Sequence, residues 1–225
     1  MADDKSRNPD LPVRFASAVV IVAISLTALW LGGWAWSGFV MLVAGGVLYE
    51  WRALVRALNP APLRETAWTL GGILYLAPAA AMLMLLREGE RGFADVLTLI
   101  ALVAAIDIGA YFTGRAVGGP KIAPAISPSK TWAGLMGAIL GALAVLVLSA
   151  KLSQATPAWW QVLGLAVLAA VVAQAGDFFE SWMKRRAGVK DSGRLIPGHG
   201  GLFDRVDGLI AVSFLAALLA GLSAL

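Results

Sequence analysis

The stretch from Ser181 to Asp207 combines lysines, arginines, glycines and carboxylates in a pattern suited to phosphate chemistry. Basic side chains neutralise phosphate charge, and glycines let backbone N–H groups approach anionic oxygens closely. Asp204 and Asp207 supply oxygens that suit Mg²⁺, which binds one or two protein carboxylates together with substrate phosphates. A basic loop that only contacts anionic lipid headgroups would explain the lysines and arginines, but not the Gly-His-Gly-Gly turn or the acids. The stretch therefore predicts a phosphate site with a divalent cation.

Four more acids stand in or beside apolar segments, where an ionisable side chain is costly unless it faces a cavity or a partner. They are Glu50, Asp107, Asp177 and Glu180. Asp177 and Glu180 are three residues apart, so both carboxylates can project from one helix face, and Asp107 stacks in the same way with Tyr111. Buried salt bridges to basic residues of the neighbouring loops are the alternative explanation, and the sequence leaves it open.

A second polar loop follows Gly114. Its first part resembles a Walker loop, but Pro120 intervenes, no Ser or Thr follows Lys121, and no strand precedes it, so we reject that interpretation. Its second part, residues 127–131, forms a polar entry to the next apolar segment. Ser127, Lys130 and Thr131 could either cap that helix or hold a nucleotide, and the spacing favours neither.

The composition indicates which elements must position these groups. Of 225 residues, 59% are apolar and 14% are charged, whereas soluble domains have about 45–50% and 25%. A soluble enzyme is therefore excluded. The absence of cysteine excludes disulfides and thiolate chemistry, and the single histidine excludes a pair of histidine ligands.

Seven apolar segments are long enough to cross a bilayer of about 30 Å, so we expect an all-α polytopic helix bundle. The expected spans are 15–33, 34–50, 66–86, 93–113, 131–150, 158–182 and 207–225. This predicts a cytoplasmic tail at 1–14, N-terminal transmembrane helices at 15–92, and a catalytic bundle at 93–225 with cytoplasmic loops 114–130 and 183–206. We take the first span as a retained anchor and not a signal peptide, because a second span follows at once and no small-residue cleavage site lies in the expected place.

The distribution of charge predicts the orientation. With the N-terminus in the cytoplasm, fifteen of the 18 lysines and arginines fall in cytoplasmic segments, as the positive-inside rule requires. The nine tryptophans fall near predicted span ends, where we expect them to lie at the membrane interface. Gly137 and Gly141 form a G-x-x-x-G spacing that predicts close helix packing.

Four ordered motifs between about residues 100 and 210 closely resemble those of bacterial phosphatidate cytidylyltransferases, also called CDP-diacylglycerol synthases. Every fixed position of the family signature Ser-x-x-Lys-Arg, four residues, Lys-Asp, then Pro-x-His-Gly-Gly-x-x-Asp-Arg-x-Asp is present from Ser181 to Asp207. The other three motifs are Asp107-x-x-Ala-Tyr-x-x-Gly-Arg, Ser127-Pro-x-Lys-Thr-x-x-Gly and Gly176-Asp-x-x-Glu-Ser. Ser129 departs from the family, where a second lysine is frequent, and the N-terminus is shorter than in the longer bacterial members.

The resemblance implies that phosphatidate attacks the α-phosphorus of CTP, giving CDP-diacylglycerol and diphosphate in phospholipid biosynthesis. It implies an integral protein of the bacterial cytoplasmic membrane whose active site faces the cytoplasm, with CTP, phosphatidate and membrane lipid as partners, and no nucleic acid. Mg²⁺ is the implied cofactor, and a second cation and a homodimer are left open.

The resemblance also suggests a role for individual residues. The expected metal ligands are Asp177 and Asp204, supported by Glu180 and Asp207. The expected catalytic residues are Asp177, Asp204, Lys190, Arg205 and His199. The expected substrate-binding residues are Asp107, Tyr111, Ser127, Lys130, Thr131, Lys184, Arg185, Arg194 and Asp207.

Two other functions fit parts of the pattern. A CTP-dependent polyprenol kinase would also use CTP and Mg²⁺, but would transfer the γ-phosphate and release CDP. An anionic-lipid transporter would explain the intramembrane acids, but would more naturally show repeated halves and broken helices. CDP-alcohol phosphotransferases are set aside because their Asp-Gly-x-x-Ala-Arg opening is absent at Asp207-Gly208.

Overall fold

The computed structural model describes residues 10–58, 60–196, 198 and 200–223, and within them seven helices dominate. The elements are α1 (Asp10–Leu31), α2 (Gly33–Ala57), α3 (Pro62–Glu88), α4 (Gly92–Ala116), β1 (Lys121–Ala123), β2 (Ser127–Thr131), α5 (Trp132–Leu152), α6 (Trp159–Arg186) and α7 (Phe203–Ser223). The prediction of a helical bundle is confirmed. The antiparallel β1–β2 hairpin was not predicted, because its five-residue strand reads as a polar helix entry in the sequence.

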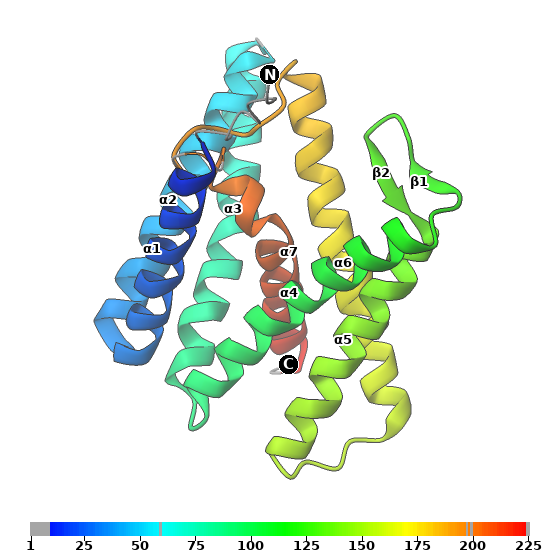
Figure 1. The fold of residues 1–225 in the computed structure, drawn as a ribbon. Helices are drawn as coiled ribbons and strands as arrows, with labels where there is room; N and C mark the ends of the chain where they lie inside the picture. The colour runs from blue at the N-terminus through cyan, green and yellow to red at the C-terminus, as the bar shows by residue number, and fades with distance from the viewer. Residues whose placement is uncertain (1–9, 59, 197, 199, 224–225) are drawn as a thin grey trace, which may run out of the picture.

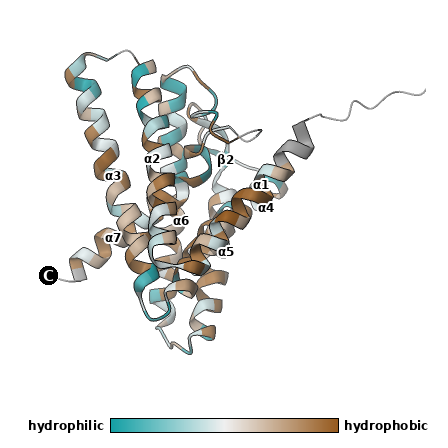
Figure 2. Ribbon diagram, turned by 90° about the vertical axis from the view of Figure 1, so that its left-hand side faces the viewer, coloured by the Kyte–Doolittle hydropathy of each residue, from teal (hydrophilic) through white to brown (hydrophobic). Residues whose placement is uncertain are grey.

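Six of the helices, α2 to α7, are long and apolar enough to cross a membrane, and the described apolar part of α1, Phe15–Leu31, is shorter. Figure 2 shows hydrophobic residues along the middle of the helices and hydrophilic residues mainly toward their ends. The protein is therefore an integral membrane protein. The expected and observed boundaries differ most at the end of α2, which continues to Ala57 instead of residue 50. Around the last loop, α6 continues to Arg186 and α7 already begins at Phe203.

The helices place the polar connections at one end of the bundle (Figure 1). The start of α1, the α2–α3 connection, the β1–β2 hairpin and the loop between α6 and α7 lie at this end, and the α1–α2, α3–α4 and α5–α6 connections lie at the opposite end. We call the described residues between α6 and α7, namely 187–196, 198 and 200–202, the α6–α7 loop, and they lie at the same end as the hairpin. Two segments far apart in the sequence are thus brought to one end of the molecule.

The close contact between α4 and α5 depends on small residues. A Cβ built on Gly137 would meet the backbone oxygen of Gly109 and the side chain of Thr113, and one on Gly141 would meet the backbone of Ala105. Glycine is required because any side chain would separate the two helices. The prediction that Gly137 and Gly141 serve helix packing is confirmed.

Two of the tryptophans assigned to the interface lie in the interior. Trp51 is 2% exposed and packs against Trp68, Tyr75, Phe179 and Phe203. Its indole N–H donates to the carbonyl of Trp68 at 2.9 Å. The interfacial interpretation was wrong for this residue because position along a span does not reveal which helix face is covered. Trp36 is likewise buried, and donates to the carbonyl of Leu83.

Candidate active site

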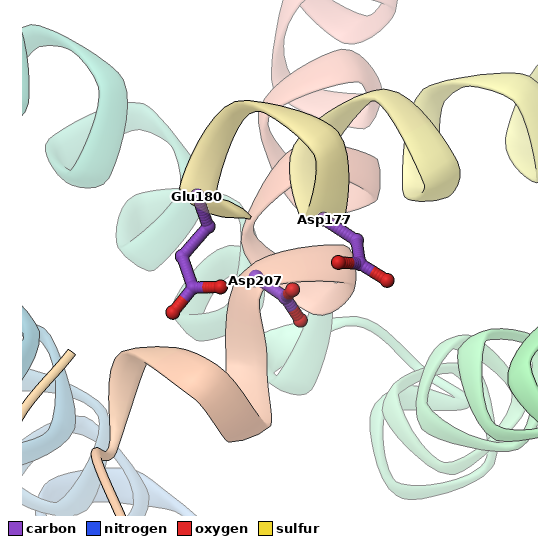
Figure 3. Close-up of side chains that lie close together, drawn as sticks. All are labelled: Asp177, Glu180 and Asp207. Carbon is purple, nitrogen blue, oxygen red and sulfur yellow. The ribbon is translucent and has the colours of Figure 1, made fainter. Parts of the chain in front are cut away.

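Three carboxylates from two helices lie close together (Figure 3). Asp177 and Glu180 project from α6 and Asp207 from α7, and each offers an oxygen within 4.8 Å of the other two. We call these three residues the acidic cluster. The helices come close here because a Cβ on Gly176 would lie 2.9 Å from the backbone oxygen of Asp207. A glycine directly before Asp177 thus lets the two acidic helices approach each other.

The donor set of the acidic cluster fits a hard divalent cation. Glu180 is buried, with only 1% of its side chain exposed. Its Oε2 pairs with Lys184 Nζ at 2.6 Å, whereas its Oε1 has no hydrogen-bond partner among the residues that the structure describes. An unpaired buried carboxylate oxygen is costly, and a cation held by three carboxylates would satisfy it.

Asp204 lies beside the acidic cluster but is engaged differently. Its Oδ2 accepts from the backbone N–H of Ser192 at 2.8 Å, the Ser192 hydroxyl at 3.0 Å and the N–H of Gly201 at 3.1 Å. Its Oδ1 pairs with Lys184, which therefore bridges Asp204 and Glu180. These contacts join Ser192 and Gly201 of the α6–α7 loop to the first turn of α7 and, through Lys184, to α6. They occupy both oxygens of Asp204.

The β1–β2 hairpin brings a cation to the acidic cluster. Lys130 Nζ, near the end of β2, lies 2.5 Å from Oδ2 of Asp177, and the hydroxyl of Ser181 donates to Oδ1 of the same carboxylate at 3.3 Å. Asp107 on α4 lies near enough to interact electrostatically with Lys130 and Asp177. Asp107, Lys130 and Asp177, from α4, β2 and α6, therefore lie close together. The order of the motifs in the sequence does not show this proximity.

The polar entry to α5 serves two purposes. Thr131 is the N-cap of α5, and its hydroxyl oxygen accepts from the N–H of Gly134 at 3.0 Å. Thr131 and Ser127 are buried, whereas Lys130 is directed to Asp177. Of the two alternatives that the sequence left open, capping therefore holds for Thr131, and nucleotide binding by Ser127 and Lys130 stays a prediction.

Most of the remaining predicted site residues are exposed, and one lies outside the described residues. Several side chains are exposed at or near this end of the bundle, namely Arg185, Lys190, Arg194, Arg205, Asp107 and Tyr111. Arg115 donates to the Tyr111 hydroxyl at 3.4 Å. His199, predicted as a catalytic residue, lies outside the described residues.

The salt-bridge alternative is realised only in part. Asp177 pairs with Lys130 of the preceding polar loop, whereas Glu180 pairs with Lys184 of its own helix. Glu50 and Asp107 make no ion pair within the described ranges, and neither does Asp207. One oxygen of Asp207 accepts from the N–H of Gly208 at 2.8 Å. Two lysines facing three carboxylates leave excess negative charge, and this favours a cation as the missing partner.

Sequence reasoning singled out Glu50 but gave it no role. Glu50 comes from α2, is 1% exposed, and accepts from the Ser192 hydroxyl and the N–H groups of Leu202 and Phe203. The only signal in the sequence is an acid near the end of an apolar segment. Its partners lie more than 140 residues away, so no local pattern could identify them.

Comparison with known proteins adds independent findings. A sequence model described as the cytidylyltransferase family matches residues 59–222. The chain is 38% identical to the phosphatidate cytidylyltransferase of Brucella suis, with 93% of each chain aligned. It is 31% identical to that of Rickettsia bellii over 99% of this chain and 95% of the relative, and 41% identical to that of Pseudomonas aeruginosa over 66% of this chain and 55% of the relative.

Proposed function

The chain belongs to the phosphatidate cytidylyltransferase family of nucleotidyltransferases, and we propose that it transfers the cytidylyl group of CTP to phosphatidate at the acidic cluster. The products are CDP-diacylglycerol and diphosphate. We place the reaction at this cluster because Asp177, Glu180 and Asp207 converge there and one buried oxygen of Glu180 has no hydrogen-bond partner among the described residues.

The acidic cluster suits Mg²⁺, whose ligands in proteins are carboxylates, waters and substrate phosphates. We propose Asp177, Glu180 and Asp207 as its ligands. When bound, Mg²⁺ supplies positive charge that neutralises the triphosphate and the leaving diphosphate. The expectation that Asp204 binds the metal stays a prediction. Lys184 and the α6–α7 loop engage both oxygens of Asp204, and we therefore propose that Asp204 holds the loop.

The reaction requires no strong base from the protein. The phosphate of phosphatidate has a second pKa of about 6 and is largely ionised near neutral pH. One of its oxygens forms a bond to the α-phosphorus of CTP while the bond from that phosphorus to the diphosphate oxygen breaks. The contribution of the chain is to orient two anions and neutralise their charge. We propose this role for Lys130 beside Asp177 and for the exposed cations Lys190, Arg194 and Arg205.

An apolar cavity of about 580 Å³ supports a lipid substrate. It lies among α3, α6 and α7, is lined by Trp68, Tyr75 and Phe179, and reaches Gly176, the residue directly before Asp177. We propose that an acyl chain of phosphatidate occupies this cavity while its phosphate reaches the acidic cluster. The lipid then remains in the membrane, and CTP arrives through the polar end of the bundle.

The charge distribution supports a cytoplasmic active site. The end of the bundle that carries the acidic cluster, the hairpin and the α6–α7 loop also carries most of the lysines and arginines. Cytoplasmic loops hold such an excess. We propose that the protein lies in a bacterial cytoplasmic membrane with this end facing the cytosol, where CTP is available. The matched relatives named above are bacterial proteins.

The test is a product analysis with the purified full chain in detergent, phosphatidate, Mg²⁺ and CTP labelled in the α-phosphate and the cytosine. We expect both labels in a lipid product and one diphosphate released per turnover, with no product when phosphatidate or Mg²⁺ is omitted. Release of CDP together with a phosphorylated lipid alcohol would instead identify a kinase. Absence of turnover, with labelled lipid moving across vesicle membranes, would favour the transporter.

A further inference from the structure

We propose that Glu50 is a positioning residue that fixes the α6–α7 loop and the start of α7, and so sets the place of Asp207 in the acidic cluster. This inference rests on the proposed function for its catalytic consequence. Glu50 belongs to the N-terminal part of the chain, 15–92, whereas the acidic cluster belongs to the part proposed as catalytic, 93–225. The α2 helix therefore has a direct part in shaping the site.

Both carboxylate oxygens of Glu50 accept hydrogen bonds from the α6–α7 loop and the start of α7. Its Oε1 accepts from the N–H of Leu202 at 3.0 Å, and its Oε2 accepts from the N–H of Phe203 at 2.9 Å and the Ser192 hydroxyl at 2.8 Å. Leu202 and Phe203 stand at the start of α7, where backbone N–H groups lack partners within the helix. A carboxylate satisfies these groups and interacts favourably with the helix dipole.

The loop is shaped around this carboxylate. A Cβ on Gly193 would collide with the Glu50 side chain, and one on Gly201 would lie 2.7 Å from Glu50 Oε2 and closer still to the hydroxyl of Ser192. Glu50 therefore leaves no room for a side chain at position 193, and Ser192 and Glu50 together leave none at position 201. Such a fit indicates a loop with one arrangement over the carboxylate.

A continuous series of polar contacts joins Glu50 to the acidic cluster. The Ser192 hydroxyl lies between Glu50 and Asp204, at 2.8 Å and 3.0 Å, and Asp204 shares Lys184 with Glu180. Asp207 follows Phe203 by one helical turn, so the orientation of the first turn of α7 decides where its carboxylate lies. Both oxygens of Glu50 are used by the loop, and Glu50 is not part of the acidic cluster, so it acts through other residues.

The primary variant is Glu50→Gln, which keeps the side-chain size but replaces one acceptor oxygen with a donor that faces an N–H or hydroxyl group. A displacement of about 1 Å in a site can reduce turnover about 100-fold, so we expect kcat to fall between about tenfold and 100-fold. We also expect the Mg²⁺ concentration for half-activation to rise, while the KM for CTP changes less than kcat. Hydrogen exchange should become faster at Leu202 and Phe203 and remain unchanged in α4 and α5.

The matched control is Glu65→Gln, which removes an acid paired with Arg56 at an exposed site on α3. We expect it to leave kcat and loop exchange unchanged. Glu50→Asp keeps the charge but shortens the side chain, and we expect it to recover part of the loss in kcat and loop protection.

Three results would overturn the proposal: full kcat with unchanged loop exchange in Glu50→Gln, faster exchange spread evenly over all helices, or Glu50→Asp no better than Glu50→Gln. If Glu50→Gln does not fold, Ser192→Ala removes one of the three donors. It should then speed exchange at Phe203 and lower kcat, and normal values for both would contradict the proposal. If the unmodified protein makes no CDP-diacylglycerol, the proposed function fails, whereas the exchange comparison still tests the role of Glu50.

Discussion

Replacing Asp204 and Asp207 separately by asparagine tests the proposal that Asp204 holds the loop and Asp207 holds the metal. The two carboxylates are three residues apart on α7, yet their contacts differ. Asp204 accepts from Ser192 and Gly201 and pairs with Lys184, whereas Asp207 belongs to the acidic cluster. We therefore expect Asp204→Asn to affect mainly stability, and Asp207→Asn mainly the response to Mg²⁺.

The magnitudes follow from these contacts. In Asp204→Asn the new amide can still accept from the loop donors through its carbonyl, but the ion pair with Lys184, which is 12% exposed, is lost. Breaking a buried pair costs about 3–5 kcal/mol, and the lower end applies because Lys184 keeps Glu180 as a partner. At about 2–4 °C per kcal/mol for a chain of this size, Tm should fall by about 6–12 °C.

Asp207→Asn should show the reverse pattern. It breaks no ion pair in the described part of the chain and removes a negative charge from beside Asp177 and Glu180, so Tm should stay constant or rise. Groups that only support metal ligands change metal affinity about 10–100-fold, so loss of a ligand should raise the half-activating Mg²⁺ concentration at least about tenfold.

The assay combines thermal unfolding, followed by tryptophan fluorescence in detergent without added metal, with product formation over a Mg²⁺ titration. If Asp204→Asn raises the Mg²⁺ requirement at unchanged Tm, and Asp207→Asn lowers Tm at an unchanged requirement, the assignment of the two carboxylates is refuted. A further check is the shift of Tm on adding a fixed concentration of Mg²⁺, which should persist in Asp204→Asn and be smaller in Asp207→Asn.

Two other substitutions test the elements around the site. Lys130→Gln removes the cation beside Asp177, and because one charge-assisted contact is worth about 1.5–3 kcal/mol, the KM for CTP should rise by about ten- to 150-fold. Lys121→Gln, at an exposed position of the same hairpin, should leave the KM unchanged, and equal KM values for the two variants would contradict the role of Lys130. Gly137→Ala overpacks the α4–α5 contact at a cost of about 1–3 kcal/mol, so Tm should fall by several degrees. Gly164→Ala has open space around the added Cβ and should leave Tm unchanged. Equal Tm values for the two variants would show that the contact tolerates a side chain.

The local features of the sequence were sufficient to predict the helical membrane bundle and to single out the residues of the acidic cluster. Hydrophobic length requires helices in a membrane, because every backbone polar group there needs an internal partner. Helical periodicity places Asp177 and Glu180 on one face, and small residues at Gly137 and Gly141 indicate close packing. These inferences depend on neighbours within a few residues, so no knowledge of the bundle was needed.

The partners of each side chain were decided by the tertiary structure. Glu50 meets Leu202 and Phe203 across 152 and 153 residues, and Trp51 is buried because α3, α6 and α7 cover its face of α2. The different contacts of Asp204 and Asp207 depend on how α7 is rotated against α6. Sequence spacing fixes which residues share a helix face, but the direction of that face depends on the packing of all the helices together, and so only the folded bundle determines which carboxylates meet.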